Sequence, residues 1–159
     1  MTCATGGRCR LRRTAAVLAL ALAVAPLTAC GADEPDYCST LKSEQKTLTS
    51  LADRADERKG DVLTPTLAAF DRLRAAAPQQ LSDEWDTVVF AYRALADAVK
   101  EAGVDPADYR PGKRPPGVTA AQARHLASVA AELDSPRVID AVVGIEDQAR
   151  QVCDVDFRG

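Results

Sequence analysis

Residues 82–103, SDEWDTVVFAYRALADAVKEAG, decide the fold of this chain. Apolar side chains recur in this stretch every three or four residues, which is the spacing of one face of an α-helix. They are Trp85, Val88, Val89, Tyr92, Leu95 and Val99. We expect Ser82 to be the N-cap, because three acidic residues follow it in the positively polarised first turn. Gly103 is expected to end the helix.

Two helices are expected before this one. The first begins near Asp36 and ends before Gly60, and the second covers about residues 64–76, with Pro65 in its first turn. Their apolar stripes are Tyr37, Leu41, Leu48, Leu51 and Ala55 in the first, and Leu67, Phe70 and Leu73 in the second. Both stripes have helical spacing, so each helix has one face to bury.

Two more helices are expected after residues 104–117. Thr119 and Gln122 form a capping box that opens the fourth, and Ser135-Pro136 opens the fifth. Their stripes are Leu126, Val129 and Leu133, then Val138, Ile139, Val142, Ile145, Ala149 and Val152. No stretch alternates apolar and polar residues over the length of a strand. We therefore predict an all-α fold, an antiparallel bundle of four to five helices.

The first 29 residues have the layout of a signal peptide. Four arginines between residues 8 and 13 precede an apolar run over residues 14–25, and no acid occurs before Asp33. The run is about a dozen residues, whereas a membrane-spanning helix needs ~20, so a permanent transmembrane segment is the weaker interpretation. Arg12-Arg13 fits the paired arginine of twin-arginine export, but the following residues lack the rest of that pattern, so we favour Sec export.

The leader closes with Leu27-Thr28-Ala29-Cys30-Gly31, which resembles the lipobox of bacterial lipoproteins. This resemblance implies cleavage before Cys30, acylation of its thiol, and stable anchoring to the outer face of the cytoplasmic membrane through two or more acyl chains. The alternative is an ordinary secretory signal in which Cys30 is coincidental or disulfide-bonded. We expect a cleaved leader over residues 1–29, a lipidated tether over 30–35 and a helical domain over 36–159.

The cleaved chain is acidic. The leader contains four arginines and no acid, so 16 basic and 23 acidic side chains remain, a net charge of −7. An acidic domain gains nothing from phosphate backbones, and nucleic acid is not an expected partner.

Two cysteines remain for pairing after cleavage. Cys3 and Cys9 leave with the leader and Cys30 is committed to lipid, so Cys38 and Cys153 are left. In an oxidising compartment they are most simply a disulfide, which would join the first helix to the last. Two free thiols or a metal pair are the alternatives. With a single histidine and no other cysteine, a tetrahedral metal site has too few ligands, and we expect neither a metal nor a cofactor.

Three short motifs suggest relatives for the cleaved chain. They are Tyr37-Cys38 at the start of the first helix, LSDEWD over residues 81–86, and Ile145-Glu146 ahead of Val152-Cys153. In these the chain resembles the small helical lipoproteins of high-GC Gram-positive bacteria. The resemblance implies a location and a fold, and it transfers no functional residues.

No catalytic frame is found in the sequence. His125 is the only histidine, and no serine or cysteine is placed near it in a way that suggests a nucleophile elbow. Neither a Gly-x-Ser-x-Gly motif nor a phosphate-binding glycine loop is present. Carboxylates such as Asp53 and Glu146 have basic neighbours and read as solvated surface, without the calcium-loop pattern. We therefore expect no catalytic residues.

Two groups of residues are candidates for binding. Trp85 is expected to be the largest core side chain, or to line an apolar cavity between helices together with Tyr92. The proline-rich connection contains Arg110, Lys113 and Arg114, which would face anionic lipid headgroups or an acidic envelope polymer, or would belong to a solvated linker.

These observations favour a membrane-anchored, non-enzymatic module that binds an envelope protein or a wall component. The second hypothesis is a small-molecule-binding lipoprotein with a pocket near Trp85. A hydrolase or transferase of the envelope ranks last, because only unplaced carboxylates and one histidine support it.

Overall fold

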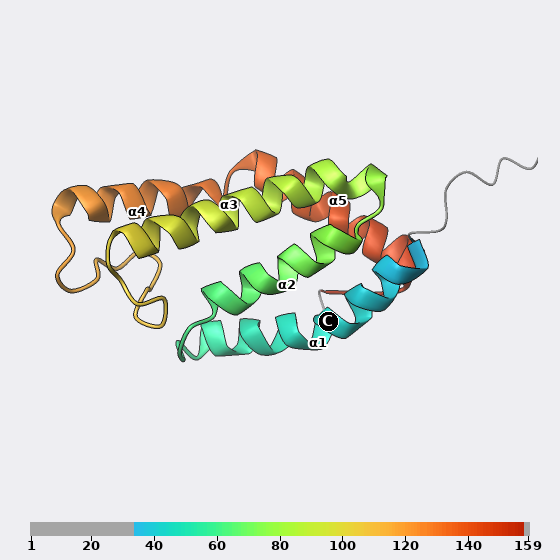
Figure 1. Cartoon of the computed structure of the whole chain (residues 1–159), viewed down its shortest axis with the longest axis horizontal. Helices are drawn as coiled ribbons and strands as arrows, with labels where there is room; N and C mark the ends of the chain where they lie inside the picture. The colour runs from blue at the N-terminus through green and yellow to red at the C-terminus, as the bar shows by residue number, and fades with distance from the viewer. Residues whose placement is uncertain (1–33, 158–159) are drawn as a thin grey trace, which may run out of the picture.

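All regular elements in the described part of the chain are helices, as predicted (Figure 1). The computed structural model describes residues 34–157. The leader and its lipobox, with Cys30, lie outside these residues. The elements are α1 (Glu34–Asp56), α2 (Leu63–Ala76), the 3-10 turn η1 (Gln79–Leu81), α3 (Ser82–Glu101), α4 (Ala120–Glu132) and α5 (Pro136–Cys153). Helix α1 thus begins within the segment that we assigned to the tether.

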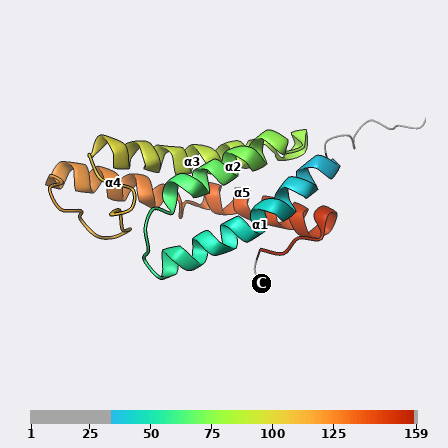
Figure 2. The same ribbon diagram turned by 60° about the horizontal axis from the view of Figure 1, so that its bottom comes forward.

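Helix α3 is the centre of the bundle. It packs against α2, α4 and α5, while α1 packs on α2 (Figures 1 and 2). Helices α4 and α5 follow one another along α3, with α5 beside its first half and α4 beside its second half (Figure 1). Helices α1, α2 and α3 alternate in direction, and α4 and α5 both run opposite to α3 (Figure 1), so the antiparallel bundle is confirmed.

A disulfide joins the first and last helices. Cys38 of α1 and Cys153 of α5 are bonded, their Cα atoms are 5.1 Å apart, and 115 positions separate them in sequence. This confirms the predicted pairing. Beside it, the side-chain amide of Gln45 donates a hydrogen bond of 2.8 Å to the carbonyl of Asp156, which holds the C-terminal tail against α1.

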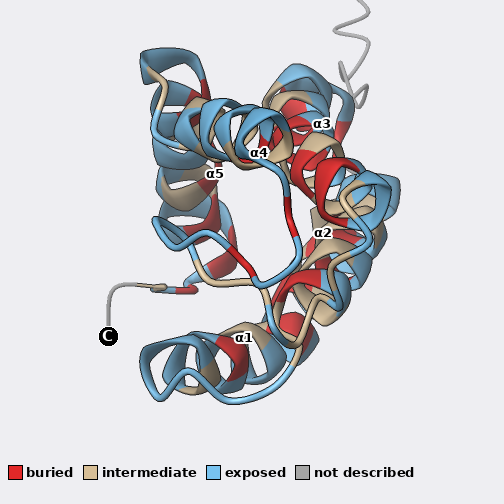
Figure 3. Ribbon diagram, turned by 90° about the vertical axis from the view of Figure 1, so that its left-hand side faces the viewer, coloured by how far each residue is buried: buried red, intermediate tan, exposed pale blue. Residues whose placement is uncertain are grey.

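The core has two parts along α3. One surrounds Trp85 and includes Tyr37 and Leu73, and the other surrounds Val99 and includes Leu126. Seen from one end of the bundle, the buried residues lie mainly on the sides of the helices that face one another (Figure 3). The Trp85 indole N–H donates to the Tyr37 hydroxyl at 3.1 Å, so the polar atoms of both rings are satisfied inside the first part. Trp85 is 3% exposed, in agreement with its predicted place in the core.

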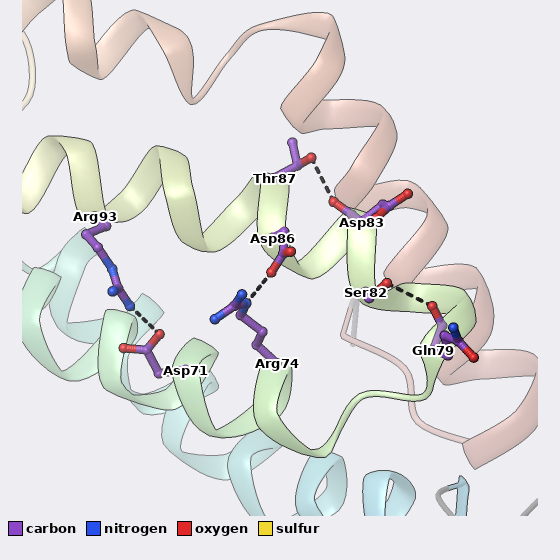
Figure 4. Close-up of polar contacts among 8 residues, drawn as sticks. All are labelled: Asp71, Arg74, Gln79, Ser82, Asp83, Asp86, Thr87 and Arg93. Carbon is purple, nitrogen blue, oxygen red and sulfur yellow. Dashed lines mark hydrogen bonds and ion pairs between the residues drawn. The ribbon is translucent and has the colours of Figure 1, made fainter.

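The predicted N-cap of α3 is wrong. Turn η1 runs directly into α3, so Ser82 already has helical backbone angles (φ −61°, ψ −40°), whereas an N-cap residue needs an extended backbone. The Ser82 hydroxyl instead donates to the carbonyl of Gln79 at 2.9 Å (Figure 4). The capping box of Thr119 and Gln122 is present as predicted.

The predicted apolar stripe of α5 is half wrong. Val138, Ile145 and Ala149 are buried, but Ile139, Val142 and Val152 are 49%, 37% and 44% exposed. Helix α5 packs mainly on α3, so only a narrow face of it is covered. That face is completed by two small or sulfur-containing residues, Ala141 and Cys153.

Ion pairs join α2 to its neighbours. Arg72 donates from Nε and Nη2 to the two carboxylate oxygens of Glu44 on α1, at 2.6 and 2.9 Å. Asp71 accepts from Arg93 at 2.6 Å, and Arg74 pairs with Asp86, both across the α2–α3 contact (Figure 4). Glu44 is the only one of these carboxylates in a buried residue.

Acid is expected to weaken the bundle through Glu44. The hydrogen bond from Arg72 holds the pKa of Glu44 below its usual value of 4.5, so its stabilising effect is complete above pH 4.5 and is lost as the pH falls through the lowered pKa. In urea unfolding, Glu44→Gln should therefore be less stable than the native chain at neutral pH, and the difference should vanish in strong acid. Glu57→Gln is the control, because the Glu57–Lys59 pair is exposed. An equal difference at both pH values would contradict this role.

Candidate functional site

A cavity of about 540 Å³ lies between the second half of α1 and the rest of the bundle. Its walls come from α1, α2, α3 and α5, from the connection before α4, and from the C-terminal tail. It exists because α1 meets α5 at the disulfide and then diverges from it (Figures 1 and 2). The volume falls within the range of about 300–1,000 Å³ that small-molecule sites occupy.

Aromatic rings form the inner wall of this interhelical cavity. Phe70 of α2 stands between Trp85 and Tyr92 of α3, with ring centroids 5.7 Å from Trp85 and 4.9 Å from Tyr92. Trp85 and Tyr92 both line the cavity, as the second hypothesis requires. Burial, with the nearby charge of Asp134, raises the pKa of Tyr92, so its phenol is neutral at pH 7. The wall is therefore apolar and uncharged.

Aliphatic side chains form the outer wall. Leu48, Leu51, Ala52 and Ala55 line the cavity from α1. Leu51 is buried, whereas the two alanines are exposed, so the cavity reaches the surface along α1.

Charged residues surround one end of the cavity. The lining cations there are Arg54, Arg58, Lys59 and Arg110, and the lining acids of the cavity are Asp56 and Glu146. Arg54 donates to the carbonyl of Asp61 at 3.0 Å, and Arg110 donates to the carbonyl of Arg58 at 3.0 Å. The second contact ties the 104–117 connection to the end of α1.

A second cavity, of about 260 Å³, lies between this connection and α4. Arg110, Lys113 and Arg114 all line it, so the structure brings together the three basic residues that the sequence singled out. Arg124 of α4 joins them, and the residues that line this cavity in the described chain include no acid. We call it the basic cavity. The sequence offered no signal for Arg124, which stands on the next helix among other polar residues.

Other candidate chemistry is not assembled at either cavity. His125 is exposed on α4 and lines neither of them. Within residues 34–157, no group of three or more histidine, cysteine, aspartate or glutamate side chains is arranged to hold a metal ion.

Comparison with models of known protein families gives no match, and no curated protein or solved structure matches the chain either. The two cavities are therefore the features of this chain that indicate what it binds.

Proposed function

We propose that this protein is a non-enzymatic, lipid-anchored binding protein of the cell envelope that holds an apolar small molecule in the interhelical cavity. The observation that carries the proposal is the cavity itself, with about 540 Å³ bounded by aromatic and aliphatic side chains. A concave space of this size between helices, with a mostly apolar lining, is typical of a small-molecule site.

The location rests on the leader and the disulfide. The signal-peptide layout and the lipobox ending at Cys30 support export and acylation. A disulfide between Cys38 and Cys153 is typical of an oxidising compartment and agrees with export. None of the helices described for residues 34–157 is long and apolar enough to cross a membrane.

An envelope protein or wall component as partner, the broader hypothesis from the sequence, stays a prediction. Helix α5 presents exposed Ile139 and Val143, and α3 presents Phe90. The interhelical cavity favours a small molecule more directly, because side chains from four helices converge on one apolar space that opens to the surface along α1.

Binding of a neutral apolar probe should change the fluorescence of Trp85, the only tryptophan of the chain. The acylated chain is held on phosphatidylcholine vesicles and titrated with decanol, and vesicles alone serve as the blank. We expect a saturable change in emission, because Trp85 lines the cavity. The double variant Ala52→Phe, Ala55→Phe should weaken binding about tenfold, a loss of about 1.4 kcal/mol, because its rings occupy the outer part of the cavity.

Ala68→Phe is the matched control, since Ala68 is exposed on α2 and does not line the cavity. It should leave the affinity for decanol unchanged. Emission that never saturates with decanol, or an equal loss in the control, would count against a ligand site in the cavity.

A further inference from the structure

We propose that the ligand is an anionic amphiphile, with its apolar chain in the interhelical cavity and its head group in the basic cavity. The head group would be bound by Lys113, Arg114 and Arg124, with Arg110 at the junction. This inference rests on the proposed function and specifies the chemical class of its ligand.

The two cavities adjoin. Tyr109 and Arg110 line both of them, so the two cavities meet at these residues. In the proposed complex the ligand passes over these two side chains, with its apolar chain on one side and its head group on the other. Tyr109 is half-buried, and burial raises the pKa of its phenol, which is therefore neutral at pH 7. Its ring is suited to the boundary between an apolar chain and a polar head group.

The charges of the basic cavity select an anion. Four cations line it, and the lining residues in the described chain include no acid. The chain without its leader has a net charge of −7, so this attraction is local and contrasts with the rest of the molecule. A cavity lined by one sign of charge concentrates ligands of the opposite sign.

Two of the cations are held in place by backbone carbonyls. Arg110 donates from Nη1 to the carbonyls of Ala107 and Tyr109, at 2.6 and 2.7 Å. Arg114 donates from Nε to the carbonyl of Val118 at 2.7 Å, and its two terminal nitrogens make no hydrogen bond within the described residues. The Arg114 guanidinium therefore keeps two parallel donors for a carboxylate or phosphate and loses little entropy on binding.

Lys113 and Arg124 supply the remaining donors. Both are exposed, and neither forms an ion pair or a side-chain hydrogen bond within residues 34–157. Their removal should therefore leave the fold intact, so these two residues are the ones to change in a test of head-group binding.

The position of the basic cavity indicates that its cations bind a single amphiphile and not the surface of the membrane that carries the protein. The 104–117 connection and the start of α4 lie at one end of the bundle, and α1 begins at the other end (Figure 1). Only three residues separate Cys30 from the first residue of α1. An acyl anchor on Cys30 would thus attach the end that is remote from the basic cavity.

The test compares four probes that share a ten-carbon chain and differ in the charge of the head group. The acylated chain on phosphatidylcholine vesicles is titrated with decyl phosphate, decanoate, decanol and decyltrimethylammonium, each below its micelle concentration, and Trp85 emission is recorded. We expect the two anions to bind about tenfold more tightly than decanol, and the cation more weakly than decanol. The preference for the anions should decrease with added salt, because the basic cavity is partly exposed.

Lys113→Gln with Arg124→Gln should remove the preference for the anions and leave decanol binding unchanged. Lys42→Gln with Lys46→Gln is the matched control, because both lysines are exposed on α1 and line neither cavity. It should keep the preference.

The outcomes separate this inference from the proposed function. Equal binding of decanol and decyl phosphate would overturn the head-group site and leave the apolar site standing. Failure of every probe to bind would overturn both. If soluble anions show no preference, but the Lys113 and Arg124 variant loses binding to added phosphatidylglycerol vesicles, the basic residues contact a membrane surface and the inference is wrong.

Discussion

Replacing Cys38 and Cys153 by serine should lower the free energy of unfolding by about 4 to 5 kcal/mol. The disulfide links positions 115 residues apart, so it removes much of the entropy of the unfolded chain. Its loss also frees α1 from α5, since their remaining contacts are few and lie near the same end. Urea unfolding followed by Trp85 emission measures the change.

Reduction supplies the control for this prediction. Dithiothreitol should destabilise the native chain by a similar amount and should leave the double serine variant unchanged. A loss below about 1 kcal/mol in the variant would mean that the unfolded chain stays compact without the disulfide, contrary to the chain-entropy argument. The variant should also bind decanol less tightly, because the disulfide positions α1 as the outer wall of the cavity.

The architecture could be predicted because it depends on two features of the sequence: the spacing of apolar residues within each helix, and the number of cysteines left for pairing. The spacing of Trp85, Tyr92 and Leu95 places one apolar face on the central helix, and the structure places all three against the core or the cavity. The pairing of Cys38 with Cys153 followed by elimination, after Cys3 and Cys9 were assigned to the leader and Cys30 to lipid. Neither prediction needed knowledge of distant contacts.

The errors occurred where tertiary context decides. Ser82 looks like a cap until the preceding turn at Gln79 gives it a helical backbone, and no residue pattern marked that turn. Ile139 and Val142 of α5 are apolar and have helical spacing, but they are exposed. Their burial would need a helix packed against that face, and α5 packs mainly on α3, with fewer contacts to α1. Periodicity predicts which residues share a face, and it does not predict whether a neighbouring helix covers that face.

The candidate site was predictable in part. Trp85 with Tyr92 and the group around Arg110 were both singled out, but as separate features. Tyr109 lies between the two features, and Arg124 of α4 joins the basic residues. Both contacts depend on how residues 104–117 fold across the end of the bundle. A loop path of this kind is set by long-range contacts such as the bond from Arg110 to the carbonyl of Arg58, which sequence spacing does not encode.

Trp85→Ala is expected to lower the free energy of unfolding by about 3 to 5 kcal/mol. Trp85 is 3% exposed, packs on Phe70, and donates to Tyr37, so its removal enlarges the existing cavity and leaves a buried hydroxyl without its donor. Circular dichroism during urea unfolding measures the loss, since the variant has no tryptophan to observe. Phe90→Ala is the matched control on the same helix, with Phe90 66% exposed, and should change stability by less than about 0.5 kcal/mol.

Trp85→Phe separates the two roles of this side chain. It retains an apolar ring at the cavity wall but removes the N–H, so the Tyr37 hydroxyl loses its partner, at a cost of about 1 to 3 kcal/mol. Adding Tyr37→Phe should recover much of that loss, because neither of the two rings then carries a buried polar atom without a partner. If Trp85→Ala were no worse than Phe90→Ala, Trp85 would not anchor the core. If Tyr37→Phe recovered nothing, the hydrogen bond would be without energetic consequence, and packing alone would account for the stability that Trp85 provides.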